Sequence, residues 1–303
     1  CDDLVEVGND RVCKEYPIEI LYCKTCNTAH QKYQIPKAEL FPKTYHYRSR
    51  FTADVLNGMK GLVADCEKYL GSLQGKRVID IGCNDGSLLD FFREKGAETI
   101  GIEPTDAYLD AKEKGHRVYN EFLTDDVAKI VVAEAGKPDV ITFTNVFAHI
   151  ENLKGVLGAL KVMLKPETII VVENHYLGSV LKSNQFDTFY HEHPRTYSYT
   201  SFEHIAKSMG LSVLTVEFPS RYGGNIRVVM GNKDLHNIPN ENQQEVLDRE
   251  KKFFDDFAKM RADIEVWEKE MKQTINDAVE KNGKLKAKAF PGRAAILIKL
   301  LGL

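Results

Sequence analysis

The sequence predicts an α/β fold in which a mostly parallel sheet is preceded by a small cysteine-bearing lobe and followed by a long helical arm. Short apolar runs alternate with helical stretches through the middle of the 303-residue chain. This rhythm is typical of parallel strands joined by crossover helices. Four of the six cysteines fall within the first 26 residues, and an amphipathic helical pattern runs through 241–282. These patterns divide the chain into residues 1–50, 51–235 and 236–303.

The middle stretch supplies seven runs of strand length, after a helix predicted over 51–74. The strands are expected at 77–81, 99–102, 117–119, 140–143, 169–172, 212–218 and 225–230. In the C-terminal part, apolar side chains recur at helical spacing between Val246 and Ile275. We interpret this stripe as a surface that docks on the rest of the protein.

Charge and hydropathy argue against two classes of partner. The 41 Lys and Arg residues are outnumbered by 44 Asp and Glu residues, and the net charge is −3. Nucleic-acid binding draws most of its affinity from excess cationic charge, so it is not expected. No apolar run approaches the roughly 20 residues of a membrane span and no leader pattern opens the chain, so we expect a cytoplasmic protein without a membrane partner. The chain begins with Cys1 and ends on apolar residues, and we expect both ends to lie within a longer protein.

The cysteine cluster near the N-terminus predicts a structural zinc site. Cys23 and Cys26 form a C-x-x-C knuckle, a spacing that lets two thiolates occupy adjacent corners of a tetrahedron. Cys1 and Cys13 are the expected partners, with His30 as an outside candidate. Such a zinc ion holds a lobe together without an open position for catalysis. The alternative, unligated thiols in a small lobe, stays open.

The first chemical motif is a glycine turn after the first strand of the sheet. Residues 77–81 run into the turn GCNDG at 82–86 and then into a helix, whose first amides are available to a ligand. The turn departs from the dinucleotide pattern G-x-G-x-x-G. The acidic residues Asp80, just before the turn, and Asp85, within it, would repel a pyrophosphate. They suit a ligand that bears an amino group and a positive sulfur. After the second strand, Glu103 is placed to bind ribose hydroxyls. The predicted cofactor contacts are Asp80, Gly82, Cys83, Asn84, Asp85, Glu103, Pro104 and Asn145.

Two further segments carry side chains suited to proton transfer. Asn145 and His149 follow the fourth strand, where strand ends line the binding crevice of an open α/β sheet. His149 in a hydrogen-bonded core position is the alternative.

The segment 185–194 contains Tyr190, Glu192 and His193, a set that fits general acid–base chemistry near neutral pH. Metal binding by His191 and His193 with Asp187 competes with this interpretation, as does a simple polar loop.

Several motifs in one order resemble a known family. They are DIGCNDG, IEP, NVFAHI, FDxxYxEH and YGGNIR, all behind a cysteine knuckle. The first two resemble motifs I and II of class I S-adenosylmethionine-dependent methyltransferases. The whole series resembles the zinc-containing sugar-nucleotide C-methyltransferases of deoxysugar biosynthesis, and it covers nearly the whole chain. The resemblance implies a class I Rossmann-like fold, S-adenosylmethionine and zinc as cofactors, and a nucleotide-linked 4-keto sugar as substrate.

The resemblance also implies roles for individual residues. The active-site residues that match the family are Tyr190, Glu192, His193 and His149, with Tyr47 or, second, Tyr45 from the linker after the lobe. His193 is expected to be the base that removes a proton beside the ketone, held by Glu192. Tyr190 is expected either to share this role or to form a hydrogen bond with the ketone. His149 and Tyr47 are expected to stabilise the enolate oxygen. The plausible substrate contacts are Tyr222, Asn225 and Arg227; for Arg227, pairing with an acid of the sheet is the alternative.

The sequence also departs from the family. His191 stands where an acid is common, and Pro194-Arg195 stands where an aromatic is usual, which leaves the substrate and the methylated carbon open. Residues 289–295 resemble the first strand and turn of the second Rossmann-like domain into which relatives continue. Two other functions stay open: an O- or N-methyltransferase, and a zinc-ribbon RNA-binding module. The sequence leaves the oligomeric state open.

Overall fold

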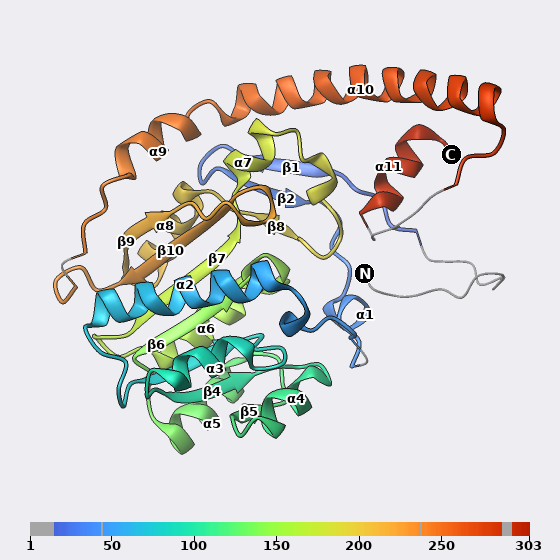
Figure 1. Ribbon diagram of the computed structural model, residues 1–303. Helices are drawn as coiled ribbons and strands as arrows, with labels where there is room; N and C mark the ends of the chain where they lie inside the picture. The colour runs from blue at the N-terminus through green and yellow to red at the C-terminus, as the bar shows by residue number, and fades with distance from the viewer. Residues whose placement is uncertain (1–14, 44, 237, 287–292) are drawn as a thin grey trace.

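The computed structural model describes residues 15–43, 45–236, 238–286 and 293–303. Its centre is a seven-stranded sheet (Figure 1) with the order β5-β4-β3-β6-β7-β10-β9. The strands are β3 (Arg77–Ile81), β4 (Glu98–Ile102), β5 (Arg117–Tyr119), β6 (Val140–Thr144), β7 (Ile169–His175), β9 (Ser212–Glu217) and β10 (Asn225–Gly231). β10 runs antiparallel to both of its neighbours, whereas the pairs from β5 to β7 are parallel. The mostly parallel sheet is therefore confirmed.

Helices cover both faces of this sheet because its buried strands alternate apolar side chains between two cores. One core packs α2 (Ala53–Leu70) and α3 (Ser87–Glu94) against Val78 and Val171. The other packs α5 (Asp125–Ala135), α6 (Leu153–Met163) and α8 (Tyr199–Ser208) against Ile79 and Val172. A short helix, α4 (Ala107–Glu113), follows β4. With its helices on both faces, the sheet leaves the carboxyl ends of its parallel strands to form a site.

The cysteine knuckle lies in a second, three-stranded sheet. β1 (Ile20–Cys23) and β2 (Thr28–Gln31) form a hairpin, and β8 (Arg195–Thr196) pairs with β2. The hairpin is tied to α8, where the Thr28 and Ser201 hydroxyls lie 2.8 Å apart. The lobe thus includes a strand from the middle of the chain, whereas the sequence predicted a lobe that ends at residue 50.

The C-terminal arm consists of two helices where the sequence predicted one. α9 (Gln243–Glu250) and α10 (Phe253–Asn282) are separated at residues 251–252. Val246, Phe253 and Met260 are buried, and Trp267 packs on Phe186 with ring centroids 5.3 Å apart. The stripe therefore docks on the protein, as expected.

After α10 the chain folds back so that α11 (Ala294–Leu301) lies against the end of α10 (Figure 1). The strand expected near residue 289 falls mostly outside the described residues, and 294–301 is helical. Short helical turns complete the fold: α1 (Lys37–Leu40), η1 (Ser49–Phe51), η2 (Phe147–His149), α7 (Leu177–Lys182), η3 (Phe186–Thr188) and η4 (Arg221–Gly223). Among the described residues, no helix has the length and apolar character that crossing a membrane requires.

A buried carboxylate attaches the arm to the sheet domain. Glu250 of α9 accepts hydrogen bonds from the amides of Tyr199 and Thr200, at 2.7 and 2.9 Å, at the N-terminus of α8. It also accepts from the hydroxyl of Tyr176 at 3.0 Å. Free amides at a helix N-terminus favour a negative charge, so Glu250 stabilises α8 and fixes α9 at once.

Replacing this carboxylate is expected to destabilise the protein. Glu250→Gln removes the charge at a fully buried site and should lower the free energy of unfolding by about 2 kcal/mol. Urea unfolding followed by circular dichroism measures it. The matched control is Glu245→Gln on the same helix, since Glu245 is exposed and should change stability by less than about 0.5 kcal/mol. Equal stability of both variants would contradict the role of Glu250.

Candidate functional site

The turn after β3 brings the backbone close to the end of β6. Gly82 has a φ of +71°, and a Cβ placed there would lie 2.6 Å from a methyl group of Val146. A side chain therefore fits neither the conformation nor the space. Asn84, also at positive φ, donates its amide to the carboxylate of Glu103 at 2.9 Å. The turn and the acid after β4 thus form one structural unit.

Two carboxylates are buried here, Glu103 within this unit and Asp80 beside it. Asp80 accepts a hydrogen bond from the hydroxyl of Thr142 at 2.7 Å, and burial together with the nearby Glu103 raises the pKa of Asp80 to about 7. Glu103 accepts from the amide and the hydroxyl of Thr105 at 2.8 and 2.6 Å, and burial raises its pKa as well. A cationic ligand would offset the cost of burying both charges.

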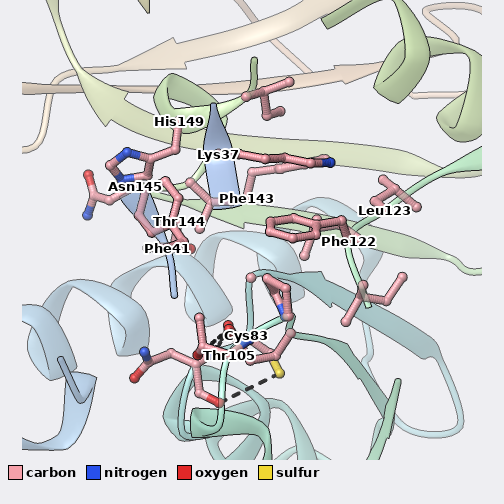
Figure 2. A pocket seen from close by; sticks show the side chains of 18 of the residues that line it. Lys37, Phe41, Cys83, Thr105, Phe122, Leu123, Phe143, Thr144, Asn145 and His149 are labelled. Carbon is pink, nitrogen blue, oxygen red and sulfur yellow. Dashed lines mark hydrogen bonds between the residues drawn. The ribbon is translucent and has the colours of Figure 1, made fainter. Parts of the chain in front are cut away.

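A cavity of about 610 Å³ opens at the carboxyl ends of β3, β4 and β6. Figure 2 shows His149 and Asn145 on one side of it, with Phe122 and Leu123 on the other. The predicted residues that line the cavity are Tyr45, Tyr47, Asp80, Gly82, Cys83, Asn84, Glu103, Pro104, Asn145, His149, Tyr190, Glu192, His193 and Tyr222. Its size suits a ligand of nucleoside dimensions together with a second small molecule.

Three histidines gather at one end of the cavity, which we call the histidine end. The ring of His193 lies 5.0 Å from that of His149 and 5.2 Å from that of His175. Burial lowers all three pKa values, that of His175 to about 4 and that of His193 well below its usual range. The positive charge of Arg293 adds to the lowering at His175 and His193. The three imidazoles are therefore neutral at pH 7.

Backbone carbonyls select the tautomers of two of these histidines. The Nδ1 of His193 lies 3.2 Å from the carbonyl oxygen of Thr188, and the Nδ1 of His149 lies 2.6 Å from that of Glu192. A carbonyl only accepts, so each Nδ1 carries the proton and each Nε2 a lone pair. The main-chain carbonyl of Glu192 thus orients His149. The Nδ1 of His193 is bound by the carbonyl of Thr188, whereas the sequence predicted that Glu192 would hold this ring.

Aromatic hydroxyls border the histidine end. Tyr190 packs on His193 with ring centroids 4.4 Å apart, and Tyr222 lies 5.6 Å from His175. Tyr222 adopts a φ of +53°, which is strained for an aromatic residue. Burial and a hydrogen bond with Tyr47 raise the pKa of Tyr222. The tyrosine predicted from the linker, Tyr47, and the one predicted from the YGGNIR motif therefore meet in space.

Three predicted contact residues lie away from the cavity wall. Asp85 is buried beneath the turn and accepts from the amide and hydroxyl of Ser87 and the amide of Arg50. Asn225 and Arg227 bind the buried carboxylate of Glu173, at 3.0 and 2.8 Å. Arg227 thus pairs with an acid of the sheet, which was the alternative interpretation. We assign structural roles to all three residues.

The expected metal site is described only in part. Cys23 ends β1 and Cys26 lies in the hairpin turn, both with free thiols, whereas Cys1 and Cys13 lie outside the described residues. Within the described ranges no group of three or more His, Cys, Asp or Glu side chains is placed to hold a metal ion. The competing metal site at His191 and His193 is not formed there, because His191 faces the carbonyl of Tyr16 at 3.0 Å and His193 that of Thr188.

Two residues of the histidine end were not predicted from the sequence. His175 ends β7, and the rule that placed Asn145 at the end of β6 could have found it. Arg293 comes from the start of α11, 100 residues after His193, and no local pattern signals it.

The strand order, the glycine turn and the acid after β4 define a class I methyltransferase domain. Residues 51–216, more than half of the chain, match the family described as methyltransferase domain, and the chain belongs to this family. The predicted methyltransferase class is thereby confirmed.

Known relatives match different shares of the chain. C-methyltransferase NovU from Streptomyces niveus is 29% identical over 70% of this chain and 51% of its own length. A ubiquinone biosynthesis O-methyltransferase from Rhodopseudomonas palustris is 36% identical over 35% of this chain and 42% of its own length. The chain thus spans about half the length of these curated relatives.

Two solved structures align with part of the chain. Magnesium protoporphyrin IX methyltransferase from Synechocystis, with bound S-adenosylmethionine, aligns with a TM-score of 0.44 and 14% identity over 59% of this chain and 80% of its own. A methyltransferase from Archaeoglobus fulgidus aligns with a TM-score of 0.46 and 16% identity over 57% of this chain and 93% of its own.

The raised pKa of Asp80 predicts a pH-dependent affinity for the cofactor product S-adenosylhomocysteine. Its ammonium group favours ionised Asp80, so affinity should rise from pH 6 to pH 8 as the carboxyl loses its proton near pH 7. Asp80→Asn should weaken binding at pH 8 by about tenfold and flatten the pH profile. Titration calorimetry measures both, with the exposed Asp126→Asn as a control that keeps the wild-type profile. An unchanged profile in Asp80→Asn would remove this carboxylate from the site.

Proposed function

We propose that the chain transfers a methyl group from S-adenosylmethionine to a carbon beside the ketone of a nucleotide-linked 4-keto sugar. The observation that carries the proposal is the histidine end of the cavity, where neutral His193 and His149 have carbonyl-bound Nδ1 atoms. The similarity to a C-methyltransferase over 70% of the chain supports it. The glycine turn, Asp80 and Glu103 fit the cofactor, because they offer an open backbone and carboxylates to a cationic nucleoside.

Carbon becomes nucleophilic only after a proton is removed, so this reaction needs a base. The Nε2 lone pair of His193 makes it our candidate, held in place by the Thr188 carbonyl and by packing on Tyr190. Because His193 is buried, protonating it alone is unfavourable. The proton transfer becomes accessible when a negative enolate forms beside it, since the two charges then compensate each other.

The enolate oxygen needs hydrogen-bond donors that are in place before the reaction. Tyr190 and Tyr47 line the cavity with hydroxyl groups, and His149 is oriented by the Glu192 carbonyl. The cofactor supplies a methyl group on a positive sulfur as the electrophile. The role of the surrounding side chains is to hold the carbon in line with that methyl group and to exclude water.

His193→Asn is expected to abolish turnover while leaving cofactor binding intact. Exchange of the substrate C–H proton for deuterium should fall by at least about 100-fold, because the base is gone. Mass spectrometry of a nucleotide-linked 4-keto-6-deoxyglucose incubated in D₂O without S-adenosylmethionine measures this step. His236→Gln, on the surface beside the Glu167 carbonyl, is the matched control and should exchange normally.

The same measurement separates the O- or N-methyltransferase alternative, which relatives matching a third of the chain keep open. Such an enzyme methylates a heteroatom and needs no C–H exchange. Wild-type methyl transfer without deuterium incorporation would therefore contradict C-methylation, and wild-type exchange in His193→Asn would reassign the base.

We infer that the hairpin lobe binds a structural zinc ion. Cys23 and Cys26 present two thiols to each other in one turn, where the Cys26 thiol lies 3.1 Å from the Thr28 hydroxyl. Two soft donors at this spacing fit half of a tetrahedral site, and further ligands have to come from outside the described residues.

Elemental analysis of the purified protein should find about one zinc ion per chain. Cys23→Ser should lose the metal and lower the melting temperature, since structural zinc contributes folding energy. Cys66→Ala, which removes a thiol buried in the α2 core, is the control that keeps the zinc. A full zinc content in Cys23→Ser would contradict the site.

A further inference from the structure

Arg293 connects the C-terminal helix with the histidine end of the cavity. It is the N-cap residue of α11 and lines the cavity. Its Nη1 donates to the hydroxyl of Thr188 at 3.2 Å and lies 3.6 Å from the carboxylate of Asp187. Both residues belong to η3, and the carbonyl of Thr188 is the group that orients His193. The guanidinium is therefore held beside the proposed base by the same short helix.

The charges on the cavity wall are unevenly distributed. Among its described lining residues, the carboxylates are Asp80, Glu103, Glu121, Asp125, Glu151 and Glu192, and the cations are Lys37 and Arg293. The ammonium group of Lys37 lies 4.0 Å from the ring of Phe122, on the side of the cavity away from His149 (Figure 2). The histidines are neutral at pH 7. Within the described part of the wall, the positive charge at the histidine end thus comes from Arg293.

The guanidinium has donors left for a ligand. Its contacts with Thr188 and Asp187 both use Nη1, and arginine carries further N–H groups on Nη2 and Nε. The Arg293 side chain is 44% exposed, so a ligand can approach it. A planar fork of N–H donors matches the oxygens of a phosphate and forms strong charge-assisted bonds with a single oxyanion.

We propose that Arg293 binds an oxyanion of the substrate at the histidine end. This inference rests on the proposed function, whose substrate offers two sources of that chemistry. One is the diphosphate of the nucleotide, which is charged before the reaction. The other is the ketone oxygen, which becomes negative as the neighbouring proton leaves and would be stabilised in the transition state.

The test compares Arg293→Met with Lys299→Met in the whole chain. Both changes replace a cation on or next to α11 by an apolar side chain of similar length, but Lys299 pairs with Glu15 on the surface. Titration calorimetry with thymidine and uridine diphosphate measures ground-state binding. Deuterium exchange of the matching nucleotide-linked 4-keto-6-deoxyglucose measures enolate formation at saturating substrate. Affinity for S-adenosylhomocysteine and the melting temperature show that each variant is folded.

Binding to the diphosphate and binding to the ketone oxygen lead to different expected results. If Arg293 binds the diphosphate, Arg293→Met weakens nucleoside diphosphate binding by about 10- to 100-fold. If it binds the enolate oxygen, exchange at saturation falls by about 100-fold while that binding is unchanged. Arg293→Lys should recover part of either loss, and Lys299→Met should behave as wild type.

Two results would overturn the proposal, and they are distinguishable. Wild-type binding and exchange in Arg293→Met would remove the role of Arg293 and leave the proposed function intact. A wild-type protein that binds S-adenosylhomocysteine but neither binds nor exchanges these sugar nucleotides would contradict the proposed function, and the oxyanion role with it.

Discussion

The ion network around Glu173 is the constraint on which the geometry of the site depends. This carboxylate is fully buried on β7. It accepts hydrogen bonds from Arg221, Arg227 and Asn225. A buried carboxylate is stable only with such compensation, so β7 and β10 are held in one register. Arg221 leads directly into the strained Tyr222, and Asn225 reaches Asn145 at 3.4 Å. The positions of two cavity residues therefore follow from a charge that lies behind the cavity wall.

Much of the fold follows from local patterns. The seven strands appear within two or three residues of their expected positions, because each is a short apolar run bounded by turn residues. The glycine turn and Glu103 were also predictable, since strand ends in a parallel sheet meet at one edge. The break between α9 and α10 was not predictable from a local pattern. Glu250, the last residue of α9, is bound by α8, about 50 residues away in the sequence.

The predicted site residues lie mostly around one cavity, but the contacts between them were not predictable from the sequence. Most of them line the cavity, but which atom holds which histidine depends on carbonyl positions that side-chain identities do not encode. Asp85 and Arg227 were predicted as contacts because they are charged and lie in a motif. In the structure they satisfy buried donors and acceptors instead of facing the cavity. Arg293 depends on how the C-terminal arm folds back, and no spacing in the sequence reports that path.

The small sheet has a consequence for exchanging parts between relatives. β8 begins two residues after His193, and the amide of Gln31 in β2 donates to the carbonyl of Pro194 at 2.9 Å. The hairpin and the histidine thus share one stretch of backbone. In a chimera that takes its N-terminal lobe from another protein, β2 would come from that protein and would have to pair with the β8 of this chain. Such a graft should include residues 186–196 as well, so the lobe is not a separable module.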